Sequence, residues 1–127
     1  MDSVVHFEIP ADDVKRASAF YKKAFGWSAQ EYGGMGYWLL GTTESNEQGA
    51  PKNPGSINGG MGKREGPLKN VTVTIAVADI DKALEKVEKL GGKTVAKKQS
   101  IGDMGFTAYF KDSEGNTVGL WQSAGNM

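Results

Sequence analysis

With 127 residues, the chain is long enough for one compact domain with a single hydrophobic core. Its 15 basic and 15 acidic residues balance, without a clustered basic stripe, which argues against a nucleic-acid-binding surface. The chain has no cysteine, which excludes disulfides, thiolate metal sites and cysteine nucleophiles and fits a reducing compartment. No apolar run approaches the roughly 18 residues of a transmembrane helix, and the first residues lack the pattern of a signal peptide. We therefore expect a cytoplasmic protein that binds neither nucleic acid nor membrane.

Residues 4–26 are repeated, in altered form, by residues 70–92. Each copy has the pattern of a strand, a polar N-cap, an amphipathic helix and a glycine at the helix end. Two copies are too few for a solenoid, so we expect a pseudo-symmetric pair of units that share one sheet. The identical positions are Val5/Val71, Ile9/Ile75, Asp13/Asp79, Ala17/Ala83, Lys23/Lys89 and Gly26/Gly92.

The first unit, residues 1–64, is expected to contain a strand, a helix and three further strands. In residues 5–9 apolar side chains alternate with polar ones, so His6 and Glu8 point away from the apolar face. Pro10 is expected to end this strand, and Gly26 to end the following helix. The apolar stripe of the helix should pack on the apolar face, which leaves His6 and Glu8 on the opposite face of the sheet. The later strands are expected at residues 27–32, 37–42 and 57–63.

The second unit, residues 66–127, has the same predicted order. A strand at residues 71–77 again alternates an apolar face with a mostly small, polar one. A helix begins at Asp79 and ends at Gly91 and Gly92. Strands follow at residues 93–99, 106–111 and 117–122, and the turn-forming residues DSEGN precede the last of them. The sequence therefore predicts an α+β fold made of two βαβββ units.

A βαβββ unit used twice, with DSEGN before the final strand, resembles the vicinal oxygen chelate superfamily, which includes glyoxalase I, extradiol dioxygenases and bleomycin-resistance proteins. The stretches VVHFEIPADD, AFYKKAFGW and DSEGNTVGLWQ look most like small bacterial members of this group. The resemblance covers nearly the whole chain. It implies one domain, residues 1–127, in which the strands of both units curl into a cup of mixed sheet with the helices outside. Because the superfamily hosts many chemistries on one scaffold, the resemblance says little about the reaction.

The resemblance also implies where metal ligands would lie. Members that use a metal place His or Glu side chains on the cup face, at matching positions of both units. His6 occupies the first-strand position, whereas Thr72, Gly119 and residues 58–60 offer neither imidazole nor carboxylate at the others. A catalytic divalent ion usually needs about three protein ligands, so we expect no tight metal site. Extradiol dioxygenase chemistry, which needs two histidines and a carboxylate, is also not expected, because His6 is the only histidine.

His6 and Glu8 are the candidate catalytic residues. An imidazole can bind a ligand or move a proton near neutral pH, and a strand carboxylate can act as a general base. The alternative is that His6 is a relic of an ancestral metal site and that Glu8 is merely solvated. Hydroxyl and aromatic side chains expected on the cup face are the candidate ligand contacts, although some of the rings could instead fill a dimer or inter-unit core. These candidates are Trp38, Thr72, Thr74, Tyr109 and Trp121.

Three functions remain open at this point. The first is a metal-independent protein of the bleomycin-resistance type that binds a small hydrophobic or aromatic molecule in the cup-shaped cavity. The second is a glyoxalase-like lyase, isomerase or epimerase acting on a small carbonyl substrate through His6 and Glu8, with a weakly held divalent ion as an option. The third is an interaction domain without a pocket. A homodimer is expected, because each half-sheet needs its edge covered.

Overall fold

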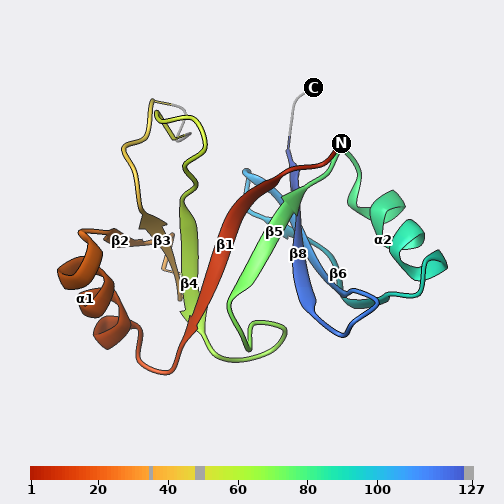
Figure 1. Ribbon diagram of the computed structural model, residues 1–127, viewed down its shortest axis with the longest axis horizontal. Coiled ribbons are helices and arrows are strands. Elements are labelled where there is room, and N and C mark those ends of the chain that lie inside the picture. The colour runs from red at the N-terminus through yellow and green to blue at the C-terminus, as the bar shows by residue number, and fades with distance from the viewer. Residues whose placement is uncertain (35, 48–50, 125–127) are drawn as a thin grey trace. The chain divides into compact units, whose positions relative to one another are not determined.

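The computed structural model (Figure 1) describes residues 1–34, 36–47 and 51–124. The chain forms two compact units. We call His6–Val71 the N-terminal unit, and Met1–Val5 together with Thr72–Met127 the C-terminal unit. This grouping differs from the expected division at residues 64–66. The start of the chain joins the second group because the Ser3 carbonyl accepts a hydrogen bond from the Ala76 N–H at 2.9 Å.

The N-terminal unit has the predicted order of a strand, a helix and three strands. Its strands align as β2-β3-β4-β1, with β1 and β4 parallel and the other neighbours antiparallel. The bounds are β1 Val4–Ala11 (which begins in the C-terminal unit), α1 Val14–Phe25, β2 Ser28–Glu31, β3 Tyr37–Gly41 and β4 Gly59–Lys63.

The C-terminal unit repeats this arrangement. Its strands align as β5-β8-β7-β6, with β5 and β8 parallel and the other neighbours antiparallel. The bounds are β5 Thr72–Ala76, α2 Ile80–Lys89, β6 Lys93–Ile101, β7 Gly105–Lys111 and β8 Thr117–Ser123. The predicted α+β class and the two βαβββ units are therefore confirmed.

The helix ends follow the capping residues of the sequence. The Asp13 carboxylate accepts from the Arg16 N–H at 3.0 Å, and the Asp79 carboxylate accepts from the Lys82 N–H at 3.2 Å. Each bond satisfies a backbone donor that the first helical turn leaves unpaired. Gly26 takes the left-handed conformation, with φ 77°, and ends α1 as expected. In the part of the chain that the structure describes, neither helix is long and apolar enough to cross a bilayer.

Two predicted strand limits in the N-terminal unit were wrong. Pro10 does not end β1, because the fixed φ of proline suits extended backbone and the Ala11 carbonyl still accepts from the Arg64 N–H at 3.2 Å. The fourth strand begins at Gly59 rather than at residue 57. The Asn58 side chain accepts from the backbone N–H groups of Thr42 and Thr43, at 2.8 and 3.2 Å, and so holds this stretch outside the strand ladder.

Each unit packs its helix on one face of its own sheet. In the N-terminal unit Ala11, Leu40 and Met61 are buried, and the surrounding apolar side chains come from α1, β1, β2 and β3. In the C-terminal unit Leu84 of α2 and Leu120 of β8 belong to the buried cluster. Because strand side chains alternate between faces, the residues between these core positions lie on the opposite face of each sheet. That opposite face carries the polar candidates.

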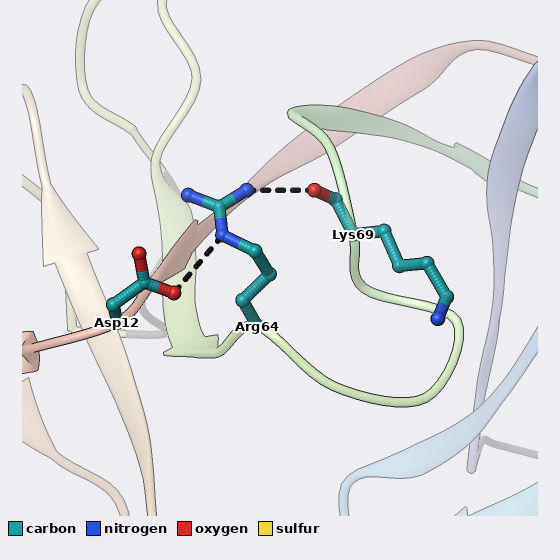
Figure 2. A network of polar contacts seen from close by, with 3 residues as sticks. All are labelled: Asp12, Arg64 and Lys69. Atoms are coloured by element: carbon teal, nitrogen blue, oxygen red, sulfur yellow. Dashed lines mark hydrogen bonds and ion pairs between the residues drawn. The ribbon is translucent and has the colours of Figure 1, made fainter.

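A polar network links the residue after β4 to the residue after β1 and to the segment between β4 and β5 (Figure 2). The Arg64 Nε donates to Asp12 Oδ1 at 3.1 Å, and its Nη1 donates to the Lys69 carbonyl at 2.7 Å. The Asp12 side chain is largely solvent-exposed, and the Arg64 side chain is about half-exposed. The network therefore fixes the path of the chain leaving β4 without forming part of the core.

Candidate functional site

His6, Glu8 and Tyr37 lie on the face of the N-terminal sheet that α1 does not cover. In β1 the side chains of Phe7 and Ile9 pack against the core, so His6 and Glu8 between and beside them point the other way. This placement agrees with the sequence prediction. In β3 the same alternation sends Leu40 to the core and Tyr37 to the face of His6.

The Tyr37 hydroxyl joins the other two side chains. It donates to Glu8 Oε2 at 2.7 Å, and His6 Nε2 lies 3.0 Å from the same phenol oxygen. A phenol has one proton, and that proton points to the carboxylate. The oxygen must therefore accept from an Nε2–H of His6, which sets the tautomer of the neutral imidazole. We call these three residues the His6–Tyr37–Glu8 group.

Burial affects the charge state of His6 within this group. Glu8 is only 8% exposed, and His6 is half-buried. Burial lowers the pKa of His6 below its ordinary value of 6.5, and the negative charge of Glu8 opposes this shift by raising the pKa. His6 is consequently neutral at pH 7. Burying a carboxylate and an imidazole costs free energy unless both are hydrogen-bonded, and such groups concentrate at functional sites.

Gly60 makes room for the Tyr37 ring. It lies opposite Glu8 in the parallel pair of β1 and β4. A Cβ at position 60 would collide with the Oη and Cζ atoms of Tyr37. The phenol can reach Glu8 only because residue 60 has no side chain.

The residues present do not fit a tightly held divalent metal. In residues 1–34, 36–47 and 51–124, no group of three or more His, Asp or Glu side chains is close enough to share an ion. His6 and Glu8 already share the Tyr37 hydroxyl, and the space beside Gly60 holds the phenol. At position 119 a Cβ would lie 2.9 Å from Thr74 Oγ1. About three protein ligands are usual for a catalytic zinc, and His6 and Glu8 supply two.

Four of the predicted ligand contacts share a face of the C-terminal sheet. Ile75 and Leu120 pack with the core of α2, so the residues that alternate with them lie on the opposite face. Thr74 lies opposite Gly119 in β8, and Gly119 lies opposite Tyr109 in β7. Thr72 and Thr74 are buried, with exposed fractions of 2% and 6%. The residues on this face are Thr72, Thr74, Tyr109 and Trp121.

Trp38 does not lie with the other candidates. Its ring packs against the core cluster of the N-terminal unit, on the face that α1 covers. The expectation that Trp38 lines the face of His6 is thus corrected: Trp38 lies opposite Met61, a core residue, and its neighbour Tyr37 takes the other face. Tyr37 was not among the residues expected from the sequence. The period of two within β3 alone could not reveal it, because Leu39 and Leu40 are equally apolar and lie on opposite faces of the strand.

A shallow depression on the N-terminal unit lies outside the His6–Tyr37–Glu8 group. Glu44 is its one titratable lining residue, and the remainder are glycines and hydroxyl residues. We assign no reaction to this depression, because Glu44 is the only lining residue that could act as an acid or a base. Its lining residues are Gly26, Ser28, Gly41, Thr42, Thr43 and Glu44.

The family model of the Glyoxalase/Bleomycin resistance protein/Dioxygenase superfamily matches residues 3–120. The chain belongs to this superfamily. Within it, the chain is 31% identical over 121 residues to the Mycobacterium bovis protein named "Putative glyoxylase CFP32", covering 91% of this chain and 44% of that protein. It is also 35% identical over 115 residues to a glyoxylase-like domain-containing protein of Didymella fabae, covering 87% and 85% of the two chains. The chain thus spans less than half the length of the mycobacterial relative.

A solved structure supports the superfamily fold. A Streptomyces coelicolor methylmalonyl-CoA epimerase in complex with 2-nitronate-propionyl-CoA aligns with a TM-score of 0.66 and 16% identity, over 96% of this chain and 97% of the epimerase. At this identity the likeness concerns the fold alone. Superfamily membership and the fold are therefore established, whereas the ligand and the reaction must be argued from the chain's own residues.

Proposed function

We propose that this protein binds a small organic molecule at the His6–Tyr37–Glu8 group, without a tightly bound metal, in the manner of a bleomycin-resistance-type member of the superfamily. The observation that carries the proposal is the phenol oxygen of Tyr37, which lies 2.7 Å from Glu8 Oε2 and 3.0 Å from His6 Nε2. A purely structural sheet face would have no need for a buried carboxylate and imidazole.

The surroundings of this group favour a hydrophobic or aromatic ligand. Leu39 alternates with Trp38 and Leu40 in β3 and so lies on the face of Tyr37, with 39% of its surface exposed. An apolar surface with a few well-placed polar groups is typical of small-molecule sites. The face of the C-terminal unit that carries Thr72, Thr74, Tyr109 and Trp121 is proposed as a second ligand-contacting surface.

Thermal-shift screening tests the proposal. A library of aromatic and acyl compounds should include CoA thioesters, since the S. coelicolor epimerase was solved with such a compound. A compound that binds the folded state raises the unfolding free energy, by roughly 2.7 kcal/mol at a concentration of 100 Kd. The apparent affinity for the compound should fall at least tenfold in Tyr37→Phe and in Glu8→Gln, and the stabilisation should shrink accordingly. Tyr32→Phe and Glu31→Gln are the matched controls and should bind as the wild type does. A library that produces no stabilisation would favour an interaction domain instead.

An isomerase or lyase acting on a small carbonyl substrate is the second candidate. The observation that favours it is the coupling of a neutral imidazole to a carboxylate through one hydroxyl. One of the two groups would accept a proton from the carbon beside the carbonyl, and the other would return a proton to that carbon. General acid–base catalysis of this kind contributes about 10²–10⁴-fold to a rate.

Hydrogen–deuterium exchange at carbon separates the two candidates. A carbonyl compound identified in the screen is incubated with the protein in D₂O, and loss of its α-proton signal is followed by NMR. An enzyme should accelerate the exchange, and His6→Ala or Glu8→Gln should remove the acceleration while far-UV circular dichroism stays unchanged. A pure binding protein should bind the compound without accelerating exchange.

A further inference from the structure

Asn58 and Gly59 form the one asparagine–glycine step of the chain. The backbone nitrogen that follows an asparagine can attack its carboxamide carbon, and glycine hinders this attack least because it has no side chain. Gly59 begins β4, and Gly60 follows it directly. The step is therefore a position where the main chain can be altered chemically, two residues before the glycine that makes room for Tyr37.

In the folded chain the Asn58 carboxamide is held at both of its polar atoms. Its Oδ1 accepts from the backbone N–H groups of Thr42 and Thr43 at 2.8 and 3.2 Å. Its Nδ2 donates to Ser45 Oγ at 2.9 Å. A backbone N–H group can only donate, so the atom that faces the two threonines must be the carboxamide oxygen. Closing a ring on Gly59 requires the carboxamide to leave these partners.

Gly59, the other reacting residue, lies inside the sheet. It is opposite Leu40 in β3 and opposite Phe7 in β1, so β4 is paired along both edges at this point. Attack on Asn58 removes the proton from the Gly59 nitrogen and bends the chain into a five-membered ring. A strand with a neighbour on each side cannot take up that ring without losing ladder hydrogen bonds. The fold therefore opposes the reaction at both reacting groups.

We propose that Asn58–Gly59 is a modification site which the fold holds in check, and that local opening converts Asn58 to aspartate or isoaspartate with water as the co-reactant. The Gly59 nitrogen forms a bond to Asn58 Cγ, and the Cγ–Nδ2 bond breaks. Nδ2 leaves as ammonia with the proton of the Gly59 N–H. Water then opens the succinimide ring. Attack of water at Cγ gives aspartate, whereas attack at the main-chain carbonyl carbon gives isoaspartate, which adds one methylene to the main chain.

The two products differ in their effect on the His6–Tyr37–Glu8 group. A carboxylate at residue 58 can keep the partners of the carboxamide, because its oxygens accept from N–H and O–H groups alike. In the isoaspartyl form the extra methylene lies at the start of β4 and shifts this strand against β1, as an inserted residue does in a bulge. Gly60 then no longer stands opposite Glu8, where its missing side chain leaves room for the Tyr37 phenol. Isoaspartate formation thus disconnects the group, whether or not an organic ligand binds there.

Peptide mapping by mass spectrometry tests the modification. The wild type is kept in mildly alkaline buffer, folded in one sample and unfolded by urea in the other, and conversion at Asn58 is followed over time. Conversion should be at least about tenfold slower in the folded sample, because the reaction must wait for a local opening. Asn53 is the internal control in both samples. It precedes Pro54, whose nitrogen carries no proton, so it should not convert by this route.

Ser45→Ala tests the hold on the carboxamide. It removes the acceptor of Asn58 Nδ2, so the conversion rate of the folded protein should rise toward that of the unfolded chain. The rate in urea should stay the same. Ser56→Ala is the matched control, because it changes another serine between β3 and β4 whose hydroxyl makes no hydrogen bond with Asn58 among the described residues.

The NMR signals of His6, the only histidine, report the consequence. After the two products are separated by chromatography, these signals should shift in the isoaspartyl form and stay in place in the aspartyl form and in Asn58→Asp. The guarded site would be overturned by absence of conversion at Asn58 in urea, by equal rates in folded and unfolded wild type, or by equal rates in Ser45→Ala and Ser56→Ala. Unshifted signals in the isoaspartyl form would overturn the effect on the group. None of these results depends on the proposed binding of an organic molecule, which the thermal-shift screen decides separately.

Discussion

Glu8 and Gly60 lie directly opposite each other in the parallel pair of β1 and β4, and the Tyr37 hydroxyl reaches Glu8 across the space above the glycine. The C-terminal unit has a related row, in which Thr74 lies opposite Gly119 and Gly119 opposite Tyr109. In both units a glycine of the last strand lies opposite a polar residue of the first strand; Tyr109 lies directly opposite its glycine, whereas Leu39 lies opposite Gly60 and Tyr37 reaches it from two residues away. The internal repeat thus extends from the elements to the candidate sites, and the polar residue is a carboxylate in one unit and a hydroxyl in the other.

Removing the hydroxyl of Tyr37 should destabilise the protein. In Tyr37→Phe the buried Glu8 and His6 lose the hydrogen bonds to their shared hydroxyl, and a hydrogen bond to a charged group contributes about 1.5–3 kcal/mol. Urea unfolding followed by circular dichroism measures the loss. Tyr32→Phe, in which no comparable bond is removed, should stay within about 0.5 kcal/mol of the wild type. Equal stability of the two variants would contradict the bonding described for Tyr37.

Adding one methyl group at position 60 should also destabilise the fold. In Gly60→Ala the Cβ displaces the phenol, and overpacking of this kind typically costs about 1–3 kcal/mol. Gly62→Ala is the control, because its Cβ meets only ordinary contacts. In a double-mutant cycle with Tyr37→Ala, the two changes should couple by about 0.5–3 kcal/mol, as contacting residues do. Strict additivity would mean that Tyr37 and Gly60 do not meet.

The titration of His6 should be displaced toward acid. Burial lowers its pKa below 6.5, so the midpoint of its NMR signals should fall below that value. The charge of Glu8 raises the pKa, so Glu8→Gln should move the midpoint to still lower pH. Glu31→Gln, an exposed carboxylate, should leave it in place. A titration midpoint that rises in Glu8→Gln would contradict the predicted effect of the Glu8 charge on His6.

The stability of the protein should depend on pH through His6. Because its pKa is lower in the folded state than in the unfolded state, the unfolded chain binds more protons just below pH 6.5. The free energy of unfolding should therefore decrease as pH falls from 6.5 toward the folded pKa. In His6→Gln this part of the slope should disappear. Unfolding in urea at a series of pH values compares the two proteins, and an identical slope in both would exclude His6 as the cause.

Loss of the Arg64 side chain should have a small effect. The ion pair with Asp12 is largely exposed, and exposed pairs contribute about 0.2–1 kcal/mol. Arg64→Ala also removes the donor to the Lys69 carbonyl, so the effect should lie near the upper end of that range. The neighbouring Lys63→Ala is the control for the lost positive charge. A loss of several kcal/mol in urea unfolding would show that the network supports more than the local chain path.

Much of the fold could be predicted from the sequence, because the repeated segment and the period of two report local structure. The placement of His6 and Glu8 away from α1 followed from the alternation of β1 alone. Tyr37 could not be placed in this way, since the choice between Tyr37 and Trp38 depends on the pairing of β3 with β4. Trp38 lies opposite Met61 and Leu39 opposite Gly60, and that register is a contact between distant parts of the chain. The role of Gly60 was hidden for the same reason.

The hydrogen bond between Ser3 and Ala76 has a consequence for the order in which the protein is made. Ser3 is translated early, yet its partner Ala76 in β5 is translated only after the whole N-terminal unit. The residues that form the N-terminal unit are therefore all translated before the hydrogen-bond partner of Ser3. A tag fused before Ser3 should therefore affect mainly the C-terminal unit, which is synthesised last.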